Sequence, residues 1–452
     1  MKLAHIGAAL ALAIATPAVA DDKPAAGDPQ LAFEKYLLPN GLEVILAPDR
    51  SVPLVAVNVW YHVGSGYEVR GKSGFAHLFE HMMFQGSKHV GEDKHFEILK
   101  KVGVDNVNGT TNTDRTNYFE VVPSNQLETA LWLESDRMGW MLDLMTKKSL
   151  DNQIEVVRNE RRQRLDNQPY GKALVAQFLA LYPEGHPYRH LVIGKHEDLT
   201  SASLEDVKGF FKTWYVPANA TLAITGDFEV AQTKQLVDKW FGKLPKSVKP
   251  AVIPVPAPPI KATEIVVTDD ALAKLDQVVF VWQSPANYAD GDAELEIVAS
   301  ALSREGPGRL YKALVYDRPL AQSVRVSQSG YAFSGEFEIT VTLRSETQLA
   351  DVKRIVLDEV ARVGREPLTD NEIQRVIASN EAFAIRGLET ALGRSQLLQD
   401  YNHYLGDPGK LSWDLDRYRT TTPEKIRAAA AKYLVADRVV TVFTDVQPNG
   451  AK

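Results

Sequence analysis

Cysteine is absent from the 452-residue sequence. Its absence excludes disulfide bonds and thiolate nucleophiles, so a metal site in this chain must use imidazole and carboxylate ligands. Long blocks of like charge are also absent, and the formal net charge is -7 at pH 7. An acidic chain without a basic stretch is not typical of proteins that bind nucleic acid or anionic membranes, which leaves peptides and other proteins as the expected partners.

Long apolar runs are scarce, and the notable one lies at the N-terminus. Lys2 precedes an apolar run at residues 6–15, and the small residues 18–20 follow it. This pattern is typical of a cleavable signal peptide at residues 1–20, and the run is too short for a good membrane span. The alternative, an uncleaved anchor helix, lacks a stop-transfer pattern after residue 20. We therefore predict export to a bacterial periplasm, with no stable membrane insertion.

The length of the chain exceeds that of one typical hydrophobic core, and 44% hydrophobic residues suffice for more than one. The proline-rich segment from residue 243 to 261 cannot form a helix and favours an extended chain. We place a linker at residues 246–262. It separates an N-terminal domain at residues 21–245 from a C-terminal domain at residues 263–452.

An internal repeat supports this division. Residues 215–227 resemble residues 433–445, and each segment follows a run with a helical pattern. An Asn40-Gly41 turn before alternating apolar residues adds a hairpin signal near the start. The predicted fold class is α+β, with two homologous α/β domains that each contain a mainly antiparallel sheet packed by helices.

The motif that carries chemistry is His77-Leu-Phe-Glu80-His81, which has the form H-x-x-E-H. The pattern from residue 73 to 84 predicts a helix, with Ser73 able to cap its first turn. Histidines four residues apart project from one face of a helix and can share a zinc ion, while Glu80 lies close enough to act as a general base. The alternative is a pair of surface histidines that binds nothing.

A zinc hydrolase site needs a third protein ligand, and Glu160 is the leading candidate. It lies on a predicted helix near the apolar residues Ile154 and Val157, which mark the buried face. Glu155 is the weaker candidate. The pattern alone also permits Glu160 to be a solvated charge among neighbouring arginines.

Together with the block at residues 186–194, these motifs make the chain resemble the pitrilysin and insulin-degrading family of inverted zincins. The resemblance is to its half-length branch, which includes mitochondrial processing peptidase and bacterial two-subunit relatives. It implies a zinc metalloendopeptidase that forms half of a clamshell, with one zinc ion held by His77, His81 and Glu160. It also implies that residues 108–118 contain an edge strand on which Asn108 and Gly109 touch the substrate.

The sequence departs from the pattern of that family at two places. Gln153 stands where active relatives have a glutamate that supports the site, and Val315 and Gln322 stand where an arginine and a tyrosine are usual. We therefore predict a heterodimer in which a homologous subunit supplies the Arg/Tyr pair around a peptide or unfolded polypeptide. Two alternatives remain open, namely a non-catalytic scaffold subunit and a self-sufficient homodimer. In the homodimer the pair would be replaced by residues from the set Arg309, Tyr311, Tyr316, Arg318 and Arg325.

Overall fold

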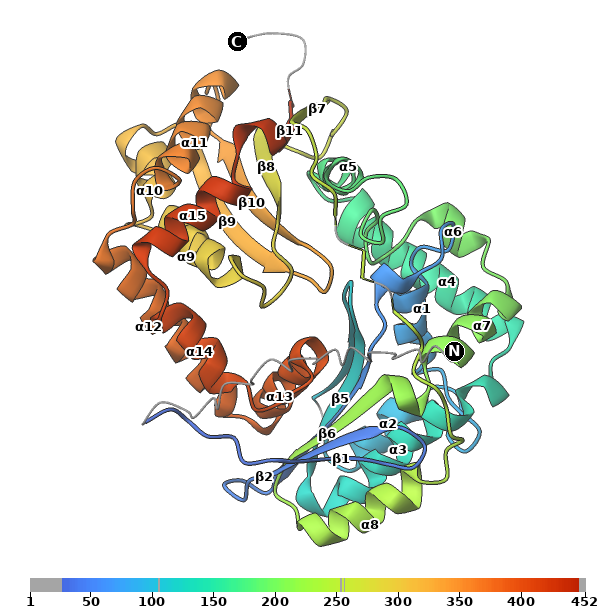
Figure 1. Ribbon diagram of the computed structural model, residues 1–452. Helices are drawn as coiled ribbons and strands as arrows, with labels where there is room; N and C mark the ends of the chain where they lie inside the picture. Colours follow the sequence, from blue (N-terminus) through green and yellow to red (C-terminus); the bar gives the residue numbers. More distant parts are fainter. Residues whose placement is uncertain (1–26, 105, 253, 256, 447–452) are drawn as a thin grey trace, which may run out of the picture.

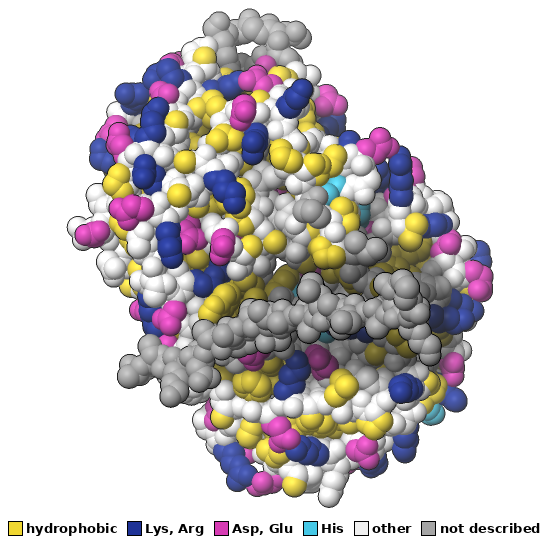
Figure 2. All heavy atoms as spheres, in the orientation of Figure 1, with side chains coloured by type: hydrophobic (Ala, Val, Ile, Leu, Met, Phe, Trp, Pro, Cys, Tyr) yellow, Lys and Arg dark blue, Asp and Glu magenta, His cyan; other side chains and the backbone are white. Residues whose placement is uncertain are grey.

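The computed structural model describes residues 27–104, 106–252, 254–255 and 257–446 (Figure 1). The predicted signal peptide lies outside the described residues. No helix within these ranges combines the length and the apolar composition that crossing a membrane requires. Figure 2 shows positive and negative side chains mixed over the face that it draws, without a large area of one sign.

The N-terminal half is built on a six-stranded sheet with the order β1-β2-β6-β3-β5-β4. Neighbouring strands are antiparallel except for β2 and β6. The Asn40-Gly41 turn joins β1 to β2, and Gly41 adopts a φ of 97° that suits glycine. The strands are β1 (Glu34–Leu37), β2 (Glu43–Pro48), β3 (Leu54–Tyr61), β4 (Val107–Thr111), β5 (Thr116–Pro123) and β6 (Ala220–Gly226).

Helices cover one face of this sheet, because every second side chain of a strand points toward that face and these side chains are apolar. Val55, Val57 and Val59 of β3 are fully buried in the same cluster as Leu78 and Phe79 of α1. The helices of this half are α1 (Phe75–Met82), α2 (Lys94–Lys101), α3 (Leu127–Trp140), α4 (Lys147–Arg161), α5 (Gly171–Leu181), α6 (His196–Thr200), α7 (Leu204–Trp214) and α8 (Val230–Phe241).

The C-terminal half repeats this plan with five strands in the order β7-β11-β8-β10-β9. Strand β11 runs parallel to β7 and antiparallel to β8, as β6 does to β2 and β3. The predicted fold class is therefore confirmed. The strands are β7 (Thr263–Val267), β8 (Gln277–Ser284), β9 (Ala321–Gly330), β10 (Gly335–Leu343) and β11 (Val440–Thr444). The helices are α9 (Asp292–Ser303), α10 (Arg309–Tyr311), α11 (Leu349–Val363), α12 (Asp370–Leu388), α13 (Ala391–Leu405), α14 (Leu411–Arg419) and α15 (Pro423–Tyr433).

Each half lends a helix to the sheet of the other half. Helix α13 lies on the N-terminal sheet (Figure 1), where Leu398 packs in one cluster with Ile45 and Ala223. Helix α5 lies on the C-terminal sheet, where Leu181 joins the cluster that contains Val281. The described residues of the segment 246–262 contain no helix or strand. The exact domain boundaries stay a prediction, but the two halves are joined by reciprocal packing as well as by this segment.

Candidate active site

The helix that carries the H-x-x-E-H motif begins later than its sequence suggests. Helix α1 starts at Phe75, and Gly74 precedes it with a φ of 92° and no side-chain cap. The carboxylate of Glu68 accepts hydrogen bonds from the backbone N–H groups of Gly74 (2.8 Å) and Ala76 (2.7 Å). An acidic group at this end of a helix also complements the helix dipole.

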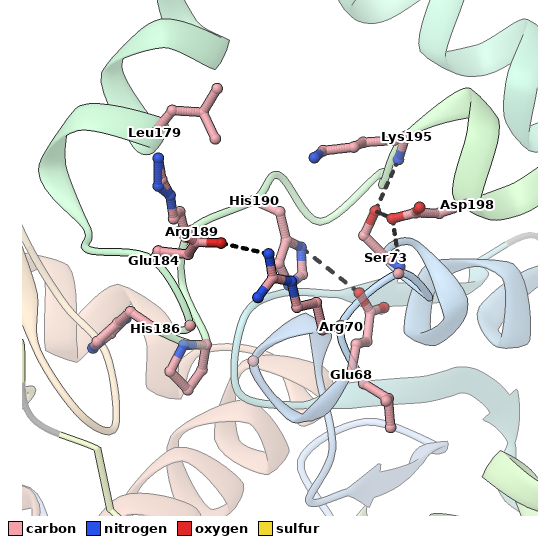
Figure 3. A pocket seen from close by; sticks show the side chains of 15 residues that line it. Glu68, Arg70, Ser73, Leu179, Glu184, His186, Arg189, His190, Lys195 and Asp198 are labelled. Carbon is pink, nitrogen blue, oxygen red and sulfur yellow. Dashed lines mark hydrogen bonds and ion pairs between the residues drawn. The ribbon is translucent and has the colours of Figure 1, made fainter.

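Ser73, expected to cap α1, instead ties the preceding turn to helix α6. Its hydroxyl donates to Asp198 (2.5 Å) and accepts a hydrogen bond from the backbone N–H of Lys195 (3.1 Å). Figure 3 shows these contacts, with Glu68 directed toward His190. The expectation of a Ser73 cap is wrong, because this turn docks against a segment more than a hundred residues away in the sequence.

His77, His81 and Glu160 meet between α1 and α4. The Nε2 atom of His77 lies 3.6 Å from a Glu160 carboxylate oxygen, and the Nε2 atom of His81 lies 3.2 Å from the same oxygen. One ligand atom from each of the three residues falls within 4.8 Å of the others. The second carboxylate oxygen of Glu160 forms an ion pair with Arg164 at 2.7 Å.

The geometry of these three groups fits a zinc ion. Zinc–ligand bonds of about 2.0–2.2 Å at tetrahedral angles hold neighbouring ligand atoms about 3.3–3.6 Å apart. Both separations from Glu160 are close to that range. Two imidazole nitrogens and one carboxylate also form a donor set that suits zinc, and they leave a fourth position available.

The surroundings favour protonation states that bind metal. Burial lowers the pKa of His77 to about 4, and the neighbouring His81 acts in the same direction. The hydrogen bond with His81 and the charge of Arg164 lower the pKa of Glu160, although burial opposes the effect. A neutral imidazole and an ionised carboxylate are the forms that donate to a metal ion.

Glu80 is held beside this group by the edge strand. The hydroxyl of Thr111 in β4 donates a hydrogen bond to the Glu80 carboxylate at 2.7 Å. Burial raises the pKa of Glu80, whereas the hydrogen bond from Thr111 lowers it. Thr111 could not be recognised from the sequence, because its contact with Glu80 depends on how β4 is placed over α1.

Asn108 and Gly109 lie on β4, which is the edge of the sheet. Asn108 is exposed, while Gly109 is buried against helix α1. A methyl group on Gly109 would lie 3.0 Å from the Cγ atom of Glu80 and 3.1 Å from the rings of Phe84 and Tyr118. A side chain at this position would therefore crowd Glu80, and glycine lets the strand approach closely.

The family model described as "Insulinase (Peptidase family M16)" matches residues 43–187, and the model described as "Peptidase M16 inactive domain" matches residues 201–380. The chain belongs to the insulinase family, M16.

Relatives within the M16 family share most of the length of this chain. "Zinc protease PqqE" of Helicobacter pylori is 27% identical over 372 residues, which are 81% of this chain and 83% of that protein. A solved structure of a protease from Helicobacter pylori has a TM-score of 0.85 and 25% identity, and the match covers 92% of this chain and 100% of the other.

A longer structure of the same fold contains this architecture as one part. The periplasmic protease PqqL from Escherichia coli matches with a TM-score of 0.76 and 16% identity. The match covers 92% of this chain but 48% of that protein. The fold of this M16 chain thus corresponds to about half of the longer protein.

Gln153, which the resemblance predicts in the place of a supporting glutamate, is buried on α4 together with Ile154 and Val157. It lies two helical turns before Glu160 and therefore on nearly the same face of the helix. Glu155, the weaker ligand candidate, is exposed and pairs with Arg158.

Val315 and Gln322, which the sequence comparison predicts in place of an arginine and a tyrosine, lie in different surroundings. Val315 packs against the C-terminal core, and Gln322 is exposed on β9. Among the possible substitutes, Arg309 is engaged with Glu372 through two hydrogen bonds of 2.6 and 2.7 Å. This arginine is committed to a contact inside its own half.

Proposed function

We propose that this chain is the zinc-bearing subunit of a metalloendopeptidase that cleaves peptides or unfolded polypeptides. The observation that carries the proposal is the convergence of His77, His81 and Glu160 from two helices, with Glu80 partly buried beside them. Membership of the M16 family and the name of the Helicobacter pylori relative support it.

In this proposal His77, His81 and Glu160 hold one zinc ion per chain. When bound, zinc supplies Lewis acidity that makes a water molecule more acidic and polarises the carbonyl group of the scissile bond. Glu80 accepts the proton of the attacking water and later gives it to the leaving amine. Thr111 holds the Glu80 carboxylate in place, and its hydrogen bond limits the rise in the pKa of Glu80. Gln153 would support the site from the buried face of α4 with its amide, without the charge of a glutamate.

The substrate is proposed to lie along β4 in an extended conformation. An exposed strand edge forms backbone hydrogen bonds with a peptide of any sequence, which suits broad specificity. Asn108 and Gly109 would contact the peptide, because they lie on the free edge next to Glu80. The absence of a side chain at Gly109 lets the peptide backbone approach that carboxylate.

We further propose that a homologous subunit completes the site in a heterodimer. The positions of Val315 and Gln322 provide no cationic or hydroxyl donor that could stabilise charge on the peptide carbonyl. The half-length match to the longer PqqL protein supports a chamber made from two such halves. A periplasmic location fits the predicted signal peptide at residues 1–20 and the periplasmic location of the structurally similar PqqL.

The test is hydrolysis of a quenched fluorescent peptide in the presence of zinc. The chain is assayed alone and mixed with a co-encoded homologous subunit that carries the arginine and tyrosine. Cleavage only in the mixture is expected. Cleavage by the chain alone would contradict the heterodimer and favour a self-sufficient homodimer. No cleavage in either sample, with zinc bound and several peptides tried, would contradict the peptidase and favour the scaffold role.

A further inference from the structure

Several hydrogen bonds hold the turn between β4 and β5. The side-chain oxygen of Asn112 accepts hydrogen bonds from the backbone N–H groups of Asp114 and Arg115, both at 2.8 Å. On its other side, the backbone carbonyl groups of Asn112 and Thr113 accept hydrogen bonds from Ser65 (3.1 Å) and Gly66 (2.8 Å). The turn is therefore closed internally and also fastened to the segment just before Glu68.

Asp114, within this turn, is fully buried and receives three donors. One carboxylate oxygen accepts from the hydroxyl of Tyr188 at 2.7 Å. The other accepts from the hydroxyl of Tyr404 at 2.8 Å and from the backbone N–H of Ala332 at 2.9 Å. No ion pair to Asp114 occurs in the part of the chain that the structure describes, so hydrogen bonds compensate for the burial of this carboxylate.

These donors come from three separate parts of the fold. Tyr188 belongs to the loop after α5, Ala332 to the turn between β9 and β10, and Tyr404 to α13. Two of the three parts are in the C-terminal half. Tyr188 also accepts a hydrogen bond from the backbone N–H of Phe333 at 3.1 Å, which extends the network into the same β9–β10 turn.

Strand β4 ends at Thr111, three residues before Asp114, and it makes the contact with Glu80. The hydroxyl of Thr111 donates to the Glu80 carboxylate at 2.7 Å. A displacement of the turn would move Thr111 and Gly109 relative to Glu80. Errors of about 1 Å at a catalytic group can change a rate by about 100-fold.

We infer that Asp114 is a positioning residue that sets β4 against Glu80 and links that placement to the C-terminal half. It touches neither the metal ligands nor Glu80, and it acts through the turn and Thr111. The catalytic consequence rests on the proposed function, whereas the placement of β4 does not.

The test compares Asp114→Asn with the matched variant Glu296→Gln. Glu296, in α9, also accepts a tyrosine hydroxyl, that of Tyr418, and its pKa is raised by burial, but it has no contact with β4. Hydrogen exchange of residues 107–111 is measured first, because it requires no activity. The amides in Asp114→Asn should exchange at least about 10-fold faster than in the wild type, and those in Glu296→Gln should be unchanged. Unchanged exchange in Asp114→Asn overturns the inference, whether or not the wild type cleaves peptides.

Peptide hydrolysis then tests the catalytic part. In whichever sample cleaves peptide, the chain alone or its mixture with the homologous subunit, Asp114→Asn should lower kcat/KM at least about 10-fold. Its zinc content should stay at the wild-type value. The variant Thr111→Val, alone and combined with Asp114→Asn, completes a double-mutant cycle in which the two effects should be non-additive. Additive effects would show that Asp114 does not act through Thr111.

If Asp114→Asn does not fold, Tyr404→Phe removes one hydrogen-bond donor to Asp114 and should give the same changes at smaller size. Faster exchange together with an inactive wild type would contradict the proposed function and still support the placement role.

Discussion

Two glutamates on α4, Glu155 and Glu160, show how position decides the role of a carboxylate. Glu155 is exposed and pairs with Arg158 on the helix surface. Glu160 faces α1 and lies 3.2 Å from the Nε2 atom of His81. The two residues are glutamates on the same helix, but only Glu160 is placed to bind a metal ion together with the histidines. This pair therefore offers a matched test of the metal site.

Replacing Glu160 by glutamine should remove most of the zinc from the purified chain. The substitution keeps the size of the side chain but takes away a charged ligand, and loss of a direct ligand should weaken binding by more than the 10- to 100-fold typical of supporting residues. Zinc is measured by elemental analysis after dialysis. Glu155→Gln is the control and should keep its zinc. Equal zinc content in both variants would contradict the ligand role of Glu160.

Replacing Glu80 by glutamine should separate chemistry from metal binding. The amide cannot accept the proton of the attacking water, so peptide hydrolysis should fall by at least about 100-fold. Zinc content should remain that of the wild type, since Glu80 is not one of the three ligands. Hydrolysis at the wild-type rate in this variant would show that another group is the general base.

Much of this site could be predicted from the sequence, and the reason is periodicity. The spacing of His77 and His81 places both on one helix face, and Ile154 with Val157 marks the face of α4 near Glu160. The support from Glu68, Thr111 and Asp114 could not be predicted, because each contact joins segments whose proximity arises only from tertiary packing. Local pattern even suggested the wrong cap, Ser73, for α1.

Helix α13 contacts the N-terminal sheet through several polar side chains. Gln399 of α13 donates hydrogen bonds to the backbone carbonyl groups of Asn58 (2.9 Å) and Thr221 (2.8 Å). His403 of the same helix stacks on His62, with their Nδ1 atoms 2.7 Å apart. Only one of these two rings can donate in that hydrogen bond, so the pair requires a neutral acceptor.

This histidine pair should make stability depend on pH. Burial lowers the pKa of His62 to about 3 and that of His403 well below its ordinary value. In the unfolded chain both groups take up protons below about pH 6.5, so the free energy of unfolding should fall as the pH drops from about 6.5 toward 3. Urea unfolding at pH 7 and pH 5, with a chelator present, measures the loss. His403→Gln should lose less stability than the wild type over this interval, and an equal loss would contradict the assignment.

The reciprocal packing of α5 and α13 makes the two halves of the protein interdependent. Removing α13 would uncover polar groups and apolar side chains of the N-terminal sheet, including Asn58 and Ile45. Removing α5 would uncover Val281 on the other sheet. The proline-rich segment and the internal repeat indicated two similar halves, but periodicity alone gave no sign of this exchange, because it reports which faces are apolar and not which helix covers them.

The two fragments produced by cutting the chain within residues 246–262 should therefore stay associated. A protease site inserted there and cleaved should give two fragments that elute together in gel filtration, since the reciprocal packing persists. Residues 27–245 produced alone should lack a cooperative unfolding transition. Separation of the cleaved chain into two folded monomers would contradict the interdependence of the halves.

Anomalous diffraction at the zinc edge, from crystals of this M16 chain grown with zinc, locates the metal directly. We predict one strong peak about 2.0–2.2 Å from the Nε2 atoms of His77 and His81 and from a carboxylate oxygen of Glu160. The absence of a peak at this position, or zinc bound only by other residues, would contradict the account.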